Sequence, residues 1–338
     1  MLRRKRFWFG LTVAVAFLAI FLARTDFDQI EESFSGADYA LAVAGIPLYF
    51  AGYWFRAFRW HLLLRPVKSI STTRLYPVVI VGLMTNNVAP MRIGELVRAY
   101  LVGQRESVSK SAALGTIALD RLLDGLTLVA ILGVMVLVSG ADTAVKSLGL
   151  AAAVFVLAGA AVVVAMALSP ALVRSWISRF TRRLPDGLEA RVEDLLDSFL
   201  SGLGGVRSPS ILLLAALASL VSWLLEAGMY FVVGEAFHLE AGFDAYLVVV
   251  SAANLALSVF ASPGGVGPFE VTTREVLIFF GVSSAAASAY AIALHALLLA
   301  PVIAVGAVLI WSSRVSMREI MGVPDTTPPG VSPSGALE

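Results

Sequence analysis

The sequence predicts an all-α, polytopic helical membrane protein with six spans and two re-entrant hairpins of broken helices, arranged as two inverted repeats. Three observations predict this class. Of the 338 residues, 58% are hydrophobic and 14% charged, whereas soluble chains are about 45–50% apolar and about 25% charged. Six apolar stretches have the length of a span, and two further stretches are interrupted by proline or glycine. This composition excludes a water-soluble enzyme, and the formal net charge of +1 argues against a nucleic-acid-binding protein.

The six predicted spans each approach the roughly 20 apolar residues, with a range of about 17–25, that cross a bilayer. They are residues 7–23, 39–58, 112–138, 147–168, 210–234 and 284–311. The first follows a basic segment but is not followed by a clear small-x-small cleavage site. We therefore interpret it as an uncleaved anchor and not as a signal peptide.

The two interrupted stretches are residues 75–102 and 245–280. Their breaks read NNVAP at 86–90 and SPGGVGP at 262–268. Proline removes a helical hydrogen-bond donor, and glycine favours non-helical backbone angles. Each stretch is therefore predicted to form two half-helices that enter and leave the membrane on one side.

The distribution of basic residues predicts the topology. With residues 3–6 in the cytoplasm, six crossings place twenty of the 25 Lys and Arg residues on that side, Arg56, Arg59 and Arg98 among them. The loops on the other side are acidic. The chain is therefore expected to be integral to the cell membrane, with both termini cytoplasmic.

Three parts are predicted along the chain: a first membrane repeat at 1–138, a second at 139–312, and a disordered cytoplasmic tail at 313–338. The second repeat contains a cytoplasmic amphipathic insert at 169–209. Its first apolar side chains share one helix face, which is typical of a helix lying at the membrane surface. These side chains are Leu172, Val173, Trp176, Ile177 and Phe180.

An internal duplication, offset by about 173 residues, indicates the two repeats. A proline is followed by a glycine four residues later in both halves, at Pro90 and Gly94 and again at Pro263 and Gly267. Residues 108–126 align without gaps to 282–300, which places Arg121 opposite His295. Each half is predicted to contain, in order, two spans, a broken hairpin and a third span. Because three spans end on the side opposite to where they began, the second half is inverted relative to the first, as in many transporters. The alternative is a duplication that only builds a stable bundle.

Ionisable residues at bilayer depth are the candidate site, because each costs about 2.5–3.5 kcal/mol on insertion scales. The half-helices after the breaks also begin near the midplane, where helix N-termini favour phosphate. The predicted binding residues are the polar, charged and glycine residues of the two tips and of span 112–138. They are Asn86, Asn87, Arg92, Glu95, Arg98, Asp120, Arg121, Asp124, Gly265, Gly267, Glu270 and Arg274. The alternative is that these charges neutralise one another in a structural network.

No catalytic residue, cofactor or metal site is predicted. The chain has no cysteine, and its three histidines (His61, His238 and His295) are scattered. Ser288 precedes His295 by two turns, and we interpret this as packing and not as a nucleophile–base pair. Whether Glu95 or Glu270 acts as a general base in a membrane transferase or carries protons in a coupled carrier stays open.

Three segments resemble the lysylphosphatidylglycerol synthase transmembrane-region family: residues 86–102, 107–126 and 262–270. The resemblance covers nearly all of residues 7–312. It implies a flippase-like protein that moves phospholipid or polyprenyl and glycolipid headgroups between leaflets. The positions that match the family's motifs are Asn87, Pro90, Arg92, Gly94, Glu95, Arg98, Arg121, Asp124, Pro263, Gly264, Gly265, Gly267 and Glu270. Asp120 departs mildly from the pattern, where glutamate is common.

The expected function is therefore a lipid flippase, and not an enzyme, for an anionic phospholipid or lipid-linked headgroup. Its partner is membrane lipid, with no nucleic acid. The chain is expected to be a stand-alone member without the aminoacyl-transfer domain, so aminoacylation is not carried over. Three arginines (Arg92, Arg121 and Arg274) are expected to hold phosphate, with Glu95, Asp124 and Glu270 pairing with them or binding an amino or sugar group. The alternatives are a membrane-embedded enzyme acting on lipid-linked substrates and an accessory scaffold.

Overall fold

The computed structural model describes residue 12 and the ranges 15–21, 27–89, 93–138, 143–181, 186–260 and 262–312. All regular elements in these ranges are helical, which confirms the all-α prediction. The predicted anchor is helical over residues 15–21. Apart from residue 12, the remainder of that span lies outside the described residues, as do the predicted phosphate ligand Arg92 and the tail at 313–338.

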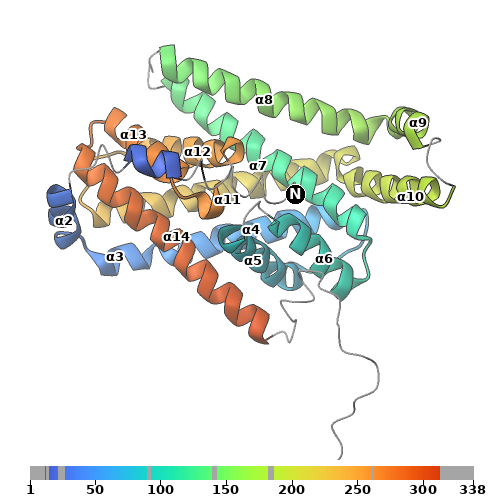
Figure 1. Ribbon diagram of the computed structural model, residues 1–338, viewed down its shortest axis with the longest axis horizontal. Coiled ribbons are helices and arrows are strands. Elements are labelled where there is room, and N and C mark those ends of the chain that lie inside the picture. The colour runs from blue at the N-terminus through green and yellow to red at the C-terminus, as the bar shows by residue number, and fades with distance from the viewer. Residues whose placement is uncertain are drawn as a thin grey trace, which may run out of the picture.

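The helices follow one another with short connections (Figure 1). In chain order they are α2 (Phe27–Ser35), α3 (Tyr39–Ala44), α4 (Ile46–Leu64), α5 (Thr72–Val88), α6 (Gly94–Glu106), α7 (Lys110–Val138), α8 (Thr143–Leu168), α9 (Pro170–Thr181), α10 (Asp186–Gly202), the 3₁₀ turn η1 (Leu203–Arg207), α11 (Pro209–Ala236), α12 (Phe243–Val259), the 3₁₀ turn η2 (Pro263–Gly265), α13 (Pro268–Phe279) and α14 (Ser284–Ser312).

Both predicted interruptions are present. The first separates α5 from α6, and Ala89 after α5 is already extended. In the second, Gly264, Gly265 and Gly267 have φ angles of 63°, 80° and 93°, which glycine adopts without the steric cost that a Cβ brings. Pro268 then occupies the first turn of α13, where its missing N–H costs nothing.

The two halves have matching helices and matching contacts. Helices α5 and α12 each have 17 residues, α7 and α14 each have 29, and α6 and α13 have 13 and 12. The first half packs α4 on α5, α5 on α6 and α6 on α7, and the second packs α11 on α12, α12 on α13 and α13 on α14. Between the halves, α5–α14 has the counterpart α7–α12. Each helix contact in one half thus has a counterpart between the equivalent helices of the other half. The inverted orientation of the halves in a membrane stays a prediction.

Helices α4 and α11, the first members of this pattern, pack against each other in antiparallel directions. Gly45, which directly precedes α4, lies against Met229 of α11, and Gly52, in the second turn of α4, lies against the Ser222 carbonyl. Small residues let helix backbones approach closely, as is common in membrane proteins. The antiparallel arrangement is the one that two inverted halves require of equivalent helices.

Membrane-spanning character is established by length and composition for part of the bundle. Among the described residues, α11 and α14 are long and apolar enough to cross a membrane. Residues 156–168 and 170–179, bent by 94°, form a third candidate. Helix α4 contains Arg56, Arg59 and His61, which lower its mean hydropathy. The chain is thus a helical membrane protein, and the six spans stay a prediction.

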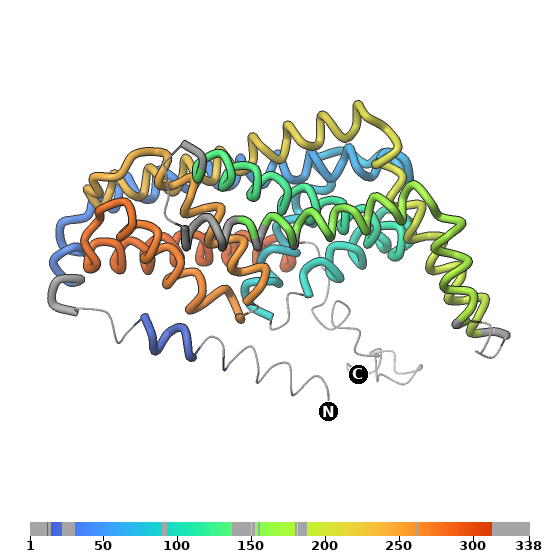
Figure 2. Tube along the Cα trace, turned by 90° about the horizontal axis from the view of Figure 1, so that it is seen from above, coloured from blue at the N-terminus to red at the C-terminus, as the bar shows by residue number. Residues whose placement is uncertain are grey.

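The predicted insert forms α9, α10 and η1. Figure 2 shows α9 and α10 projecting together from one end of the bundle. Because α9 meets α8 at 94°, it lies across the axis of α8 and does not continue it. Arg174 of α9 donates to Asp197 of α10 at 2.6 Å, which ties the two helices together. This geometry supports a surface helix if α8 spans the membrane.

A first prediction tests the crossing of α7 and α10. A Cβ on Gly115 would overlap the carbonyl oxygen of Phe199 and lie 3.1 Å from Gly202 Cα. Gly115→Ala is therefore expected to destabilise the protein by about 1–3 kcal/mol, because the backbones must separate. Thermal unfolding in detergent micelles measures the change.

The matched control is Gly133→Ala on the same helix, where no atom lies within 4 Å of the new Cβ. Alanine is the better helix former, so this variant is expected to unfold at or above the wild-type temperature. Equal unfolding temperatures for the two variants would contradict the close crossing.

Candidate functional site

A buried ion cluster joins α4, α7 and α11. The side chain of Arg59 on α4 is 0% exposed. Its Nε donates to Asp120 Oδ1, and its Nη1 donates to Asp124 Oδ1 and to Ser219 Oγ, each at 2.7 Å. Asp120 and Asp124 stand four residues apart on α7 and so share one helix face. One guanidinium therefore links three helices from both halves of the chain.

Arg98 on α6 adds a second buried guanidinium to this cluster. Its Nη1 donates to Asp120 Oδ2 at 3.0 Å, and its Cζ lies 4.1 Å from the centre of the Trp60 ring. Gly82 leaves room for it, since a Cβ there would come within 2.9 Å of Arg98 Cδ. Its Nε and Nη2 have no hydrogen-bond partner among the described residues. Arg98 is therefore a buried cation with two donors to spare in the described part of the chain.

Arg121 on α7 is the exposed member of the cluster. Its Nη2 lies 3.2 Å from Asp124 Oδ2 and 3.6 Å from Asp120 Oδ2, yet 47% of its side chain is exposed. It stands eleven residues after Lys110, about 16 Å along the helix and near the middle of α7. It also interacts electrostatically with Glu95. If α7 spans the membrane as the sequence predicts, a charge exposed at this position needs water or a polar headgroup against it.

A neighbouring ion pair extends the polar region along α4 and α11. Arg56 Nη2 donates to Glu226 Oε2 at 2.7 Å, and Arg56 Nε donates to Ser222 Oγ at 2.9 Å. Trp223 packs on the guanidinium with its ring centre 4.1 Å from Cζ. Tyr230 donates to Glu226 Oε1 at 3.4 Å. The pair is buried and has polar contacts on both sides.

The tip of the first hairpin is closed by Asn86. Its Oδ1 accepts the N–H of Gly94 at 2.7 Å, and its Nδ2 donates to Glu95 Oε1 at 3.3 Å. Gly94 lies so close to Gly82 that a Cβ would overlap the Gly82 carbonyl oxygen. The first N–H of α6 therefore already has a partner within the protein, although helix N-termini in general favour anions.

The tip of the second hairpin is closed by a carboxylate and an imidazole. Glu270 Oε2 accepts the N–H of Gly267 at 2.7 Å, and Glu270 Oε1 lies 2.5 Å from His295 Nδ1. His295 Nε2 lies 2.9 Å from the carbonyl oxygen of Gly264. Sequence reasoning missed the pairing of His295 with Glu270. The duplication held a signal for it, because it aligns His295 with the charged residue Arg121.

The two tips touch each other. A Cβ on Gly264 would lie 3.1 Å from the carbonyl oxygen of Asn87, and η2 packs against α5. Gly265, beside Gly264, lies against Leu257 of α12. The two breaks thus lie side by side in a direct backbone approach.

Arg274 lies away from the tips. Its Nε donates to Ser288 Oγ at 3.0 Å, its Nη2 to Ser284 Oγ at 2.6 Å and its Nη1 to Glu275 Oε1 at 2.5 Å. Ser284 precedes His295 by eleven residues, or about 16 Å along α14. Arg274 therefore bonds to the first turns of α14, and the phosphate-binding role predicted for it stays a prediction.

Three arginines that were expected in the cytoplasm are buried in the structure: Arg56, Arg59 and Arg98. The sequence did not reveal this burial, because their partner carboxylates lie on other helices. Arg59 and Asp120 are 61 residues apart, and Arg56 and Glu226 are 170 apart. A basic residue near the end of an apolar stretch looks the same in sequence whether it faces the cytoplasm or a buried partner.

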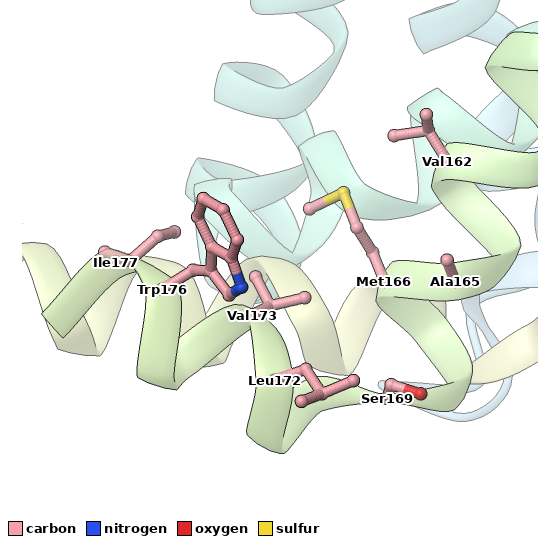
Figure 3. A pocket seen from close by; sticks show the side chains of 8 residues that line it. All are labelled: Val162, Ala165, Met166, Ser169, Leu172, Val173, Trp176 and Ile177. Carbon is pink, nitrogen blue, oxygen red and sulfur yellow. The ribbon is translucent and has the colours of Figure 1, made fainter. Parts of the chain in front are cut away.

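An open groove at the bend between α8 and α9 has a different character (Figure 3). Its lining is apolar except for Ser169: Val162, Ala165, Met166, Ser169, Leu172, Val173, Trp176 and Ile177. It suits hydrocarbon and not a charged headgroup. Within the described residues, no group of three or more His, Asp and Glu side chains is placed to hold a metal ion.

Comparison with known proteins bears on this arrangement. A family model described as lysylphosphatidylglycerol synthase TM region matches residues 7–306. The chain is 27% identical to glycosyltransferase AglD of Haloferax volcanii over 344 residues, which cover 91% of this chain and 54% of AglD. It thus spans about half the length of that relative. Two UPF0104 membrane proteins of Methanothermobacter thermautotrophicus are 25% and 26% identical and each cover 82% of the chain, with 87% and 84% of their own lengths aligned.

The comparison corrects one expectation drawn from the sequence. The scattered histidines and the absence of cysteine suggested that the chain is not an enzyme. AglD, which aligns with 91% of the chain, is named a glycosyltransferase, and this overturns that expectation.

A second prediction tests the buried cluster. Arg59→Met removes the nearest cation of both Asp120 and Asp124 and the only fully buried one, so it is expected to destabilise the protein by about 3–5 kcal/mol. Unfolding in detergent micelles, followed by circular dichroism, measures the loss. The control is Arg74→Ala, which removes an exposed pair with Glu106 at 3.6 Å and is expected to cost less than about 1 kcal/mol. Wild-type stability in Arg59→Met would contradict a structural role for the cluster.

Proposed function

The chain belongs to the lysylphosphatidylglycerol synthase TM-region family, and from this membership we propose that it binds an anionic lipid headgroup at the buried ion cluster and moves the lipid between leaflets. The observation that carries the proposal is Arg121, a half-exposed guanidinium near the middle of a 29-residue helix. A phosphate that covers this guanidinium removes the cost of exposing it to hydrocarbon.

The guanidiniums of the cluster support an anionic ligand. Around Asp120 and Asp124, the guanidiniums of Arg59, Arg98 and Arg121 all lie within ion-pair distance. Among the described residues, Arg121 is half exposed and Arg98 has two donors without a partner, so these N–H groups are available to phosphate oxygens. A guanidinium presents several N–H groups in one plane, which matches two oxygens of a phosphate.

The neighbouring carboxylate suggests what else the headgroup contains. Glu95 is part-buried at the tip of the first hairpin, bonded to Asn86 and within electrostatic reach of Arg121. A carboxylate accepts hydrogen bonds from amino and hydroxyl groups. A headgroup with a phosphate and an amino group or sugar therefore fits Arg121 and Glu95 together.

The repeated contact pattern supports movement between leaflets. Transporters built from two inverted halves bind their ligand where broken helices meet, and one half moves against the other. Here the two broken hairpins meet through Gly264 and Asn87. Six spans, re-entrant hairpins, cytoplasmic termini and location in the cell membrane are parts of this proposal.

Glycosyl transfer onto or from a lipid-linked sugar is the second candidate function, and the similarity to glycosyltransferase AglD favours it. The same cluster would then hold the phosphate of the lipid-linked substrate, and Glu95 would be placed to accept a proton from a sugar hydroxyl. Mass spectrometry of lipids incubated with the purified protein separates the two functions. A translocase leaves the lipid mass unchanged, whereas a transferase changes it by one sugar.

A third prediction concerns Arg121. In liposomes, wild-type protein is expected to accelerate leaflet exchange of fluorescently labelled phosphatidylglycerol, and Arg121→Ala is expected to slow this exchange at least about tenfold. A charge-assisted hydrogen bond contributes about 1.5–3 kcal/mol, which corresponds to that factor or more. Arg121→Lys keeps the charge but loses the planar fork, so an intermediate rate is expected.

Two controls accompany this assay. Arg74→Ala removes an exposed arginine at the start of α5 and is expected to exchange lipid at the wild-type rate. Labelled phosphatidylcholine, which has no net charge, is expected to exchange more slowly than phosphatidylglycerol. The proposal fails if neither phosphatidylglycerol nor a lipid-linked sugar phosphate is exchanged, or if Arg121→Ala is as fast as wild type.

A further inference from the structure

The imidazole of His295 is held between two hydrogen-bond acceptors at the tip of the second hairpin. On one side, Nδ1 lies 2.5 Å from the Glu270 carboxylate, and on the other, Nε2 lies 2.9 Å from the Gly264 carbonyl oxygen. The side chain is 7% exposed. Phe269 covers one ring face, with 4.5 Å between ring centres. Both ring nitrogens are therefore engaged inside the protein.

This geometry requires two protons on the three groups. A carbonyl oxygen only accepts, so Nε2 must carry a proton toward Gly264. A second proton must lie between Nδ1 and Glu270 Oε1, whichever atom holds it, because two lone pairs at 2.5 Å repel each other. Glu270 Oε2 already accepts from the N–H of Gly267. A neutral imidazole beside an ionised carboxylate has one proton too few for this arrangement.

We propose that the Glu270–His295 pair binds the proton that controls the contact between the two hairpin tips. With the proton bound, the pair holds Gly264 against α14. We call the two contacts of His295, with Glu270 and with Gly264, the clasp. When the proton leaves, a lone pair on His295 faces either Glu270 or the Gly264 carbonyl oxygen, and the contact on that side separates. Gly264 is the residue that lies against Asn87, so its release loosens the tip-to-tip contact. This inference rests on the proposed function, because it makes lipid movement dependent on protonation.

The charged and titratable groups on the neighbouring helices are bonded elsewhere or point away from His295, so Glu270 is its charged partner among the described residues. From α13, Arg274 is directed to Ser284 and Ser288, away from the ring. From α11, Tyr230 reaches Phe269, with 6.4 Å between ring centres. From α5, the tip brings the uncharged residues Asn86 and Asn87, with the Asn87 carbonyl toward Gly264.

Two further helices, α4 and α2, and the rest of α14 complete the surroundings of His295. Helix α4 brings Arg56 and Arg59, which are bonded to Glu226 and to Asp120 and Asp124. Helix α2 brings Glu31 and Glu32, both exposed. On α14 itself, Tyr290 donates to the Tyr230 carbonyl oxygen at 2.8 Å.

The first half contains a permanent cation at the equivalent position. The gapless alignment of 108–126 with 282–300 places Arg121 opposite His295. Arg121 stays charged at every physiological pH, whereas histidine changes charge between about pH 5 and pH 8. The two halves therefore differ at this position: the contact made by His295 in the second half depends on a proton, whereas the charge of Arg121 in the first half does not.

Distance measurements between the tips test this proposal directly. The chain has no cysteine, so Val88→Cys and Val259→Cys introduce two unique spin-label sites, on residues that are 60% and 65% exposed beside the two breaks. In liposomes at about pH 5, a short and narrow distance distribution is expected. At about pH 9 the mean distance is expected to lengthen by about 3 Å or more, the separation that a water between formerly bonded atoms requires.

Two variants separate protonation from general destabilisation. His295→Arg supplies a permanent cation with donors on both sides, so the short distance is expected at both pH values. His295→Gln has no titratable proton, so its distance is expected to be the same at both pH values and longer than that of wild type at about pH 5. The proposal is overturned if the wild-type distance does not change with pH, or if His295→Gln responds to pH as wild type does.

The same liposomes distinguish failure of this inference from failure of the proposed function. If the distance responds to pH in wild type alone but labelled phosphatidylglycerol is not exchanged, the clasp is correct and lipid translocation is wrong. If exchange is observed while the distance is independent of pH, translocation stands and the clasp is wrong. If both occur, the exchange rate of wild type is expected to change with pH at least about fivefold more than that of His295→Arg.

Discussion

The buried guanidinium of Arg59 is the interaction on which the arrangement of the bundle depends. It bonds to Asp120 and Asp124 of α7 and to Ser219 of α11, so it joins helices from both halves of the chain. In an apolar surrounding, a charge without such partners costs several kcal/mol, and removing one partner leaves the others exposed to that cost. The packing of α4 on α7 and α11 is therefore restricted to positions that keep all three contacts, and the hairpins that follow α4 and α11 take their places from these helices.

Backbone proximity is the second constraint. The hairpin tips meet where Gly264 lies against Asn87, and inside the first hairpin Gly94 lies against Gly82. No side chain fits at these positions without moving a backbone. In membranes, where apolar contact between helices gains little over contact with lipid, close approach and interhelical hydrogen bonds replace hydrophobic burial as the source of specificity. The polar cluster and the glycine contacts thus act together to fix how the helices and the two tips pack.

The sequence predicts much of this fold and part of the site. The two helix breaks follow from proline and glycine, which act locally. The structure confirms the break at 262–268, whereas the break predicted at 86–90 begins later, because α5 continues through Val88 and α6 begins at Gly94. The facing of Asp120 and Asp124 follows from helical periodicity. The roles of Arg59 and His295 were missed, because their partners are 61 and 25 residues away and no local pattern links them. Long-range pairing of single charged residues is set by packing, which one sequence without its relatives does not reveal.

The difference between Arg59 and Arg121 separates a structural network from a binding site. Arg59 satisfies both aspartates at 2.7 Å and is fully buried, so the connection between α4 and α7 does not need a second arginine. Arg121 adds a longer contact at 3.2 Å while leaving 47% of its side chain exposed near the middle of α7. A residue present only to balance charge is cheapest when buried with its partners, because exposure to hydrocarbon is what the membrane penalises. If α7 spans the membrane, an arginine that the α4–α7 connection does not need and that is half exposed is better explained by ligand binding than by packing, and both proposed functions place a phosphate there.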